Sequence, residues 1–223
     1  MQRAVALFGG ICGAAIVACS GFSSEEASFD ADADAEVSGD SGDTGDAAQG
    51  AADASVEMDA DLTRKRLFLT SETYDGAGAG GGDQSCINLA ADAGLGGTWA
   101  AWLSKGLGAE KSAAGRMAWK GPWYDLTRKN IVIAAPDQDG GAFPAPTRPI
   151  AWTQTGDTLT TAHVWTGTTA DGTTAAGSLC GTWSDNSATK FGVFGVLDIG
   201  PSWTRATGAD PCSSSNHLYC FEQ

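Results

Sequence analysis

Apolar residues repeat with the period of an α-helix in one stretch of the chain, and elsewhere they form short alternating or apolar runs. The helical stretch starts near Asp83, placed as an N-cap, and ends before Gly94, placed just after the C-cap. Its apolar positions are Cys86, Leu89, Ala90 and Ala93. Residues 66–70 alternate and predict a first strand. The pattern therefore predicts one main helix that follows a strand.

The remainder of the chain predicts short strands joined by long loops. Residues 98–104 fit a strand or a short helix equally well. Residues 123–126 and 131–134 flank a polar stretch and predict a hairpin. Residues 135–162, which contain four prolines, predict a long loop region. Further strands are expected at residues 163–166, 182–184, 191–196, 202–205 and 217–221.

The chain begins with the pattern of an exported lipoprotein. Arg3 precedes an apolar run, Val5–Val17, that is too short to span a bilayer. Small residues then lead into Cys19, so residues 1–18 are predicted to be a lipoprotein signal peptide and Cys19 the lipidated residue. An ordinary signal peptide with an incidental cysteine is the alternative. Ser20 is typical of lipoproteins sorted to an outer membrane, which predicts a location in the envelope of a Gram-negative bacterium.

Residues 19–62 are expected to form an acidic, disordered tether between the lipid anchor and a domain. Residues 20–62 hold 13 acids and no Lys or Arg, with almost no apolar bulk that could offset the entropy of ordering. A flexible coil of this length spans roughly 35 Å root-mean-square. The alternative, a calcium-binding acidic repeat, lacks the turn glycines and the bidentate glutamate of a calcium loop.

Most of the net negative charge of the chain lies in the predicted tether. The net charge is −14, but residues 63–223 carry 12 Lys and Arg against 14 Asp and Glu, a difference of −2. Beyond Arg64-Lys65-Arg66 no basic stripe exists, so a nucleic-acid partner is not expected. The sequence predicts one folded domain over residues 63–223 and makes no prediction about its oligomeric state.

The six cysteines fall into three groups: one in the signal peptide, one lipid anchor and four in the domain. Cys12 lies in the signal peptide and Cys19 is the predicted anchor, which leaves an even number in an oxidising compartment. The remaining four are Cys86, Cys180, Cys212 and Cys220. They predict two disulfides rather than a metal site, and from spacing alone all three pairings stay open.

The cysteines lie in blocks whose order resembles a known family. The blocks are Gly82–Cys86, Ala101–Ser104, Val164–Gly167, Cys180–Trp183, Cys212 and Leu218–Glu222. They resemble the endostatin domain of collagens, which has a C-type-lectin-like fold, and still more closely bacterial lipoprotein domains of unknown function related to that fold. The resemblance implies an α+β domain with a mixed, mainly antiparallel sheet, one main helix and long loops.

The resemblance also implies how the cysteines pair and which tryptophans are buried. In the family the disulfides are nested, which carries over to this chain as Cys86–Cys220 and Cys180–Cys212. The tryptophans inside or beside the matching blocks are expected to be core residues. They are Trp99, Trp102, Trp165, Trp183 and Trp203.

No catalytic, metal or cofactor site is predicted. His163 and His217 lie beside apolar strand residues and are interpreted as structural. The acidic and amide positions that hold calcium in sugar-binding C-type lectins are not matched before Cys180 or Cys212. Asp137 and Asp139 begin like a calcium loop, but Arg148 occupies the position of the glutamate.

Two places are candidates for ligand binding. The resemblance implies that residues 135–179 form the variable loop surface, and its candidate residues are Asp137, Asp139, Arg148 and Trp152. Replacing Arg148 and Trp152 with alanine is expected to abolish binding without changing the thermal midpoint. The second place is the turn between Trp119 and Trp123, where an exposed ring could stack on a sugar or peptide, unless both rings pack under the loop.

The function expected from these features is a non-enzymatic binding or adhesion module for an extracellular protein or glycan, independent of calcium. A structural envelope lipoprotein without a discrete ligand is the alternative, and a secreted hydrolase is the third.

Overall fold

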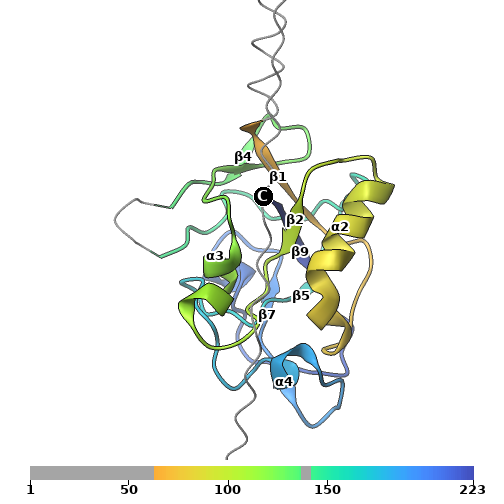
Figure 1. Ribbon diagram of the computed structural model, residues 1–223, viewed down its shortest axis with the longest axis vertical. Helices are drawn as coiled ribbons and strands as arrows, with labels where there is room; N and C mark the ends of the chain where they lie inside the picture. Colours follow the sequence, from red (N-terminus) through yellow and green to blue (C-terminus); the bar gives the residue numbers. More distant parts are fainter. Residues whose placement is uncertain (1–62, 137–141) are drawn as a thin grey trace, which may run out of the picture. The chain divides into compact units, whose positions relative to one another are not determined.

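The protein is described from a computed structural model that covers residues 63–136 and 142–223. A five-stranded sheet forms its centre, in the order β2-β9-β1-β3-β4. The strands are β1 Lys65–Leu69, β2 Trp99–Ala101, β3 Trp123–Tyr124, β4 Ile131–Ile133 and β9 Tyr219–Glu222. Only β1 and β3 pair in parallel, and the other neighbours in this sheet are antiparallel (Figure 1). The domain is thus mixed α+β with a mainly antiparallel sheet, as the sequence predicts.

The strand β1 is buried on both faces and divides the core. Phe68 points into a cluster that contains Cys86, Trp99 and Trp165. Leu67 and Leu69 point the other way, into a cluster that contains other large aromatic side chains. The five tryptophans expected in the core are all buried. A strand covered on both faces reads as a continuous apolar run, which is the sequence of this strand after Arg66.

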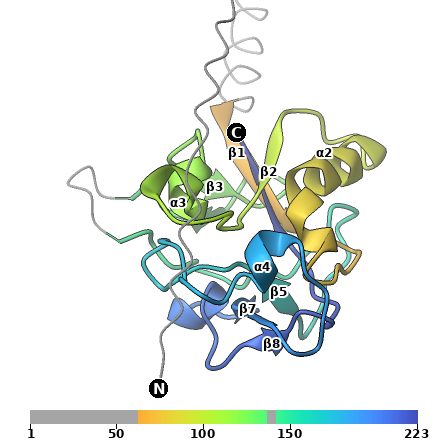
Figure 2. The same cartoon turned by 60° about the horizontal axis from the view of Figure 1, so that its bottom comes forward.

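The main helix, α2 Gly82–Asp92, lies alongside β2 (Figure 1, Figure 2). Gly94 follows the C-cap with φ at 67°, which confirms the predicted end of the helix. The prediction for Asp83 was wrong, because the N-cap is Gly81. The Asp83 carboxylate instead accepts hydrogen bonds from Lys105 and Arg116, at 2.7 and 2.6 Å, and so ties the helix to the segments after β2.

Two strand pairs lie outside the central sheet, β5 His163–Trp165 with β7 Phe194–Val196 and β6 Phe191–Gly192 with β8 Asp210–Pro211. In both views β5 and β7 lie below the central sheet (Figure 1, Figure 2). The short helices are α3 Ala113–Arg116, α4 Cys180–Trp183 and three 3-10 turns at Gly78–Gly81, Ala109–Lys111 and Pro201–Trp203. Within residues 63–136 and 142–223, no helix is both long and apolar enough to cross a membrane.

Several strand predictions are confirmed and others were wrong. The hairpin β3–β4 and the strands β1, β5 and β9 are present. Residues 98–104, which fit a strand or a short helix equally well in sequence, contain the strand β2. The run 191–196 is broken, because the Val193 amide and carbonyl bond to Ser178 and to residues 166–167 instead of continuing one strand. Residues 202–205 begin inside a 3-10 turn rather than a strand.

The segment predicted as a strand at residues 182–184 is a left-handed helical turn. Cys180, Gly181, Thr182 and Trp183 have φ of 46°, 63°, 63° and 62°. Each non-glycine residue in this conformation costs about 1–2 kcal/mol. The turn is held at both ends, by the Cys180–Cys212 disulfide and by the Trp183 indole, whose Nε1 donates to the Ser104 carbonyl at 2.6 Å.

Both disulfides of the nested pattern are present. Cys86–Cys220 joins α2 to β9, and Cys180–Cys212 joins α4 to the segment after β8. The linked residues lie 134 and 32 positions apart. Restricting the unfolded chain in this way stabilises the fold by about 5 and about 4 kcal/mol in the chain-entropy account.

A buried ion pair also ties the first strand to the last. The Arg66 guanidinium donates to both oxygens of Glu222, at 2.8 and 3.0 Å, and the Arg66 amide donates to the same carboxylate at 2.9 Å. The two side chains are only 6% and 4% exposed. Arg66 also lies over the Trp99 ring, 5.4 Å from its centroid. The carboxylate is therefore desolvated and accepts three hydrogen bonds from Arg66.

We predict that Glu222→Gln lowers the free energy of unfolding by about 3 kcal/mol, since it leaves a buried guanidinium without its counter-charge. Urea unfolding measures the change. Glu110→Gln is the control, because Glu110 is exposed and its replacement should cost less than about 0.5 kcal/mol. Equal urea midpoints for the two variants would show that the Arg66–Glu222 ion pair does not contribute to the stability of the fold.

Candidate functional site

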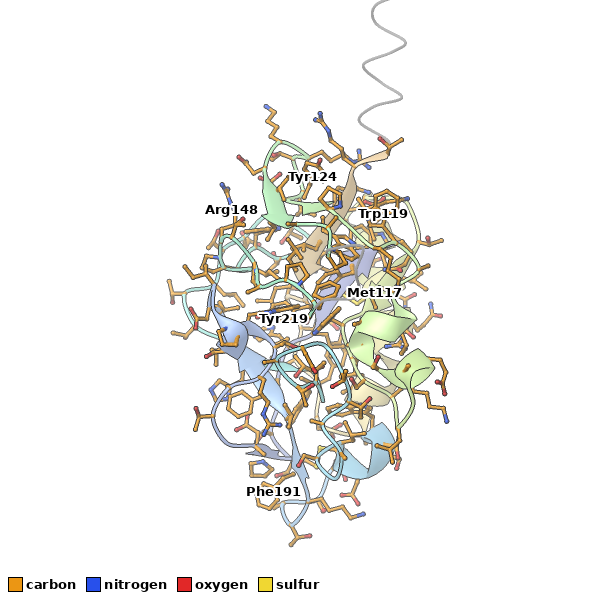
Figure 3. All side chains as sticks on the ribbon, turned by 90° about the vertical axis from the view of Figure 1, so that its left-hand side faces the viewer. Met117, Trp119, Tyr124, Arg148, Phe191 and Tyr219 are labelled. Atoms are coloured by element: carbon orange, nitrogen blue, oxygen red, sulfur yellow. A yellow bond between two sulfur atoms is a disulfide. The ribbon has the colours of Figure 1, made fainter. Side chains whose placement is uncertain are left out.

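An open pocket of about 200 Å³ lies between the β3–β4 turn and the long loop that precedes β5. It is lined by Asp125, Leu126, Thr127, Arg148, Trp152 and Gly156. Figure 3 shows Arg148 and Tyr124 toward one end of the domain and Phe191 at the opposite end. Two residues predicted as ligand contacts, Arg148 and Trp152, are thus brought to one cavity.

The wall formed by the turn is held by Asp125. Its carboxylate accepts hydrogen bonds from the Thr127 hydroxyl at 2.7 Å, the Asn130 amide at 2.6 Å and the Lys129 backbone at 3.2 Å. Burial raises the pKa of Asp125, but the hydrogen bonds from Asn130 and Thr127 outweigh it and hold the pKa below the ordinary 3.8. Such a side chain closing its own turn is typical of Asx motifs. The turn is therefore rigid before any ligand arrives.

The opposite wall is formed by Trp152, which is half-buried. Its indole Nε1 donates to the Leu67 carbonyl at 3.0 Å, and its own carbonyl accepts from the Leu69 amide at 2.9 Å. The loop is thereby bonded directly to β1, and the ring has a fixed orientation. Trp152 is at once part of the fold and a surface of the pocket.

The guanidinium of Arg148 is exposed at the rim of the pocket. It makes no hydrogen bond or ion pair with the part of the chain that the structure describes. Its backbone is held, because the preceding Thr147 donates from its amide to the Val132 carbonyl at 2.7 Å and from its hydroxyl to the Ile131 carbonyl at 3.0 Å. A fixed backbone thus presents five free N–H donors beside an apolar wall.

The second predicted place, the Trp119–Trp123 turn, is not a binding surface at Trp123. That prediction was wrong, because Trp123 is fully buried and its Nε1 donates to the Glu222 carbonyl at 3.1 Å. Pairing of β3 with β1 carries its ring into the core. Trp119 is half-buried, and its Nε1 donates to the Pro122 carbonyl at 3.1 Å. Asp137, Asp139 and Cys19 lie outside the described residues.

Both histidines are bonded within the fold. His217 Nδ1 lies 2.7 Å from the Thr70 carbonyl. His163 Nδ1 lies 2.8 Å from Asp210, and its ring stacks on Phe194. Neither lines the pocket. Across residues 63–136 and 142–223, no three His, Cys, Asp or Glu residues are grouped so that they could hold a metal ion.

A second pocket, of about 290 Å³, is lined by Gly106, Leu107, Gly177, Leu179, Gly181 and Thr182. It lies beside the left-handed turn and offers one hydroxyl but no charged side chain. A site that fixes a ligand needs a few placed polar groups in an apolar surround. The pocket at Arg148 meets that requirement better.

Four of the residues that line the chosen pocket were not predicted from the sequence: Asp125, Leu126, Thr127 and Gly156. The only signal was the polar stretch that predicts the hairpin turn. No protein-family model matches the chain, and no curated protein matches it. The function must therefore be argued from the site.

We predict that Trp152→Ala lowers the free energy of unfolding by about 2–3 kcal/mol, because it removes a half-buried ring and a hydrogen bond to β1. Arg148→Ala should change it by less than about 0.5 kcal/mol. The structure thus revises the expectation that both replacements leave stability unchanged. Urea midpoints measure both, and an unchanged midpoint for Trp152→Ala would contradict the assigned packing.

We predict that the carboxyl of Asp125 titrates below 3.8 in the folded protein and that Asn130→Ala raises its pKa. A depressed folded pKa means that the turn contributes stability above the unfolded pKa and loses it as the pH falls through the folded value. Carboxyl-carbon NMR titration measures the midpoint. A midpoint that Asn130→Ala leaves in place would contradict the closed turn.

Proposed function

We propose that this chain is a lipid-anchored, extracytoplasmic binding module whose ligand is a glycan. The observation that carries the proposal is the pairing of a fixed tryptophan face, Trp152, with an unengaged guanidinium, Arg148, across one small open pocket. Aromatic faces accept the apolar side of a sugar ring, and the guanidinium donates to its oxygens. A pocket of about 200 Å³ suits one ring of a chain rather than a large cofactor.

We further propose that the fold is C-type-lectin-like. The order of the cysteine blocks, the nested disulfides and a sheet that brings the first and last strands together support the assignment. The two disulfides also support an oxidising compartment, because such bonds persist outside the cytosol. Anchoring through Cys19 to an outer membrane rests on the sequence pattern alone.

The proposed binding needs neither calcium nor catalysis. Among the described residues that line the pocket, only Asp125 carries a carboxylate, and it already accepts several hydrogen bonds from its own turn, whereas calcium takes six to eight oxygens. The Asp125 carboxylate lies 2.7 Å from the Thr127 hydroxyl, but it also accepts hydrogen bonds from Lys129 and Asn130 that hold the turn, so we assign no reaction to the pocket. The protein is expected to hold its ligand and release it unchanged.

We predict that a glycan array detects binding by the wild-type protein and that Arg148→Ala weakens it at least tenfold without a change in thermal midpoint. Arg205→Ala is the matched control, since Arg205 is an exposed arginine that does not line the pocket. A chelator should have no effect. Binding that survives Arg148→Ala, or that a chelator abolishes, would refute this function. Binding only to matrix proteins would replace the glycan with a protein ligand.

A further inference from the structure

Cationic side chains gather around the β3–β4 turn. The turn itself carries Arg128 and Lys129. Arg64 is bound to it, because Arg64 Nη1 donates to the Arg128 carbonyl at 3.3 Å and Arg128 Nε donates to the Arg64 carbonyl at 3.0 Å. Arg148 faces the same turn across the pocket. Segments far apart in sequence therefore place four cations at one end of the domain.

Three carboxylates of the described residues near this turn and pocket accept hydrogen bonds from other groups. Asp125 binds its own turn, Glu222 is buried against Arg66 with Arg128 at 3.8 Å, and Asp157 accepts from the Thr155 hydroxyl at 2.7 Å. Arg64, Lys129 and Arg148 form no ion pair with a carboxylate in the described part of the chain. The guanidinium of Arg64 lies instead 5.6 Å from the centroid of the Tyr124 ring. We call Arg64, Lys129 and Arg148 the basic rim.

The basic rim is a local feature of the surface. Residues 63–223 have 12 basic and 14 acidic side chains, so the domain as a whole has almost no net charge. A cluster of cations that form no ion pair among the described residues raises the local potential of a nearly neutral domain and attracts anions. Because the three side chains are exposed, salt should screen that attraction strongly.

We propose that the ligand of this site is an acidic glycan, a chain in which successive sugars carry a carboxylate. The inference rests on the proposed function and narrows it. A uronic acid combines a ring face for Trp152 and Leu126 with a planar carboxylate that matches the two parallel N–H donors of Arg148. Lys129 and Arg64 then meet the carboxylates of neighbouring sugars. A polyanion without sugar rings would interact with the basic rim but would make no contact with the apolar wall formed by Trp152 and Leu126.

The test compares a hexamer of galacturonic acid with its methyl ester, which has the same rings and no charge. Calorimetry on the full-length protein should give at least tenfold tighter binding of the acid at about 50 mM salt, with the difference lost near about 500 mM. Lys129→Gln should weaken acid binding about threefold and leave ester binding unchanged. Lys190→Gln is the control at a distance, because it removes one charge beside Phe191, at the opposite end of the domain, where Lys190 pairs with Asp185 at 2.7 Å (Figure 3).

Each contrary result points to a different failure. Equal affinity for acid and ester, or equal effects of Lys129→Gln and Lys190→Gln, would overturn the acidic ligand. A further contrary result is that polyphosphate binds as tightly as the galacturonic acid hexamer, with an affinity that Trp152→Phe does not change. That result would show that the site attracts any polyanion through charge alone, and it would also overturn the acidic glycan as ligand. If neither hexamer binds while array glycans still bind through Arg148, only this inference fails. If no glycan binds at all, the proposed function fails with it.

Discussion

The pairing of β1 with β9 is the constraint on which the rest of this domain depends. Phe68 lies opposite Cys220 in that pair, and Cys220 carries the disulfide to α2. Two positions earlier in β1, Arg66 binds the carboxylate of Glu222. Covalent, ionic and backbone bonds therefore converge on two adjacent strands, and these strands join the two ends of the folded chain.

The same strands position the candidate site. Trp152 is bonded to β1 through the Leu67 carbonyl and the Leu69 amide. The turn opposite it follows β3, which pairs in parallel with the start of β1. Both walls of the pocket are thus attached to one strand, so the pocket is rigid although loops line it. Rigid placement lowers the entropy that a ligand would otherwise lose on binding.

The sequence predicts the local parts of this arrangement better than the distant ones. The apolar run within residues 66–70, the helical spacing that ends at Gly94 and the β3–β4 hairpin are all visible in short windows of the sequence. The buried tryptophans and the disulfide pairing followed from the resemblance. The role of Asp83 could not be predicted from the sequence, because its partners Lys105 and Arg116 lie outside any short window around it.

The errors share one physical cause, which is that long-range contacts override local preference. Trp123 looks like a turn aromatic in sequence, yet its strand pairs with β1 and its ring is buried. The residues after Cys180 look like a strand, yet a disulfide and an indole hydrogen bond hold them in a left-handed turn. The pocket needs the hairpin turn and the loop at Trp152 together, and no local pattern joins them.

The proposed ligand is expected to bind at the pocket between the Trp152 ring and the Arg148 guanidinium. Side-chain NMR during titration with an oligosaccharide is the most direct test. We expect the signals of the Trp152 ring and of Arg148 Nε–H to shift together and saturate, while those of His163 and Phe191 stay in place. Saturable shifts confined to the His163 and Phe191 end would contradict it.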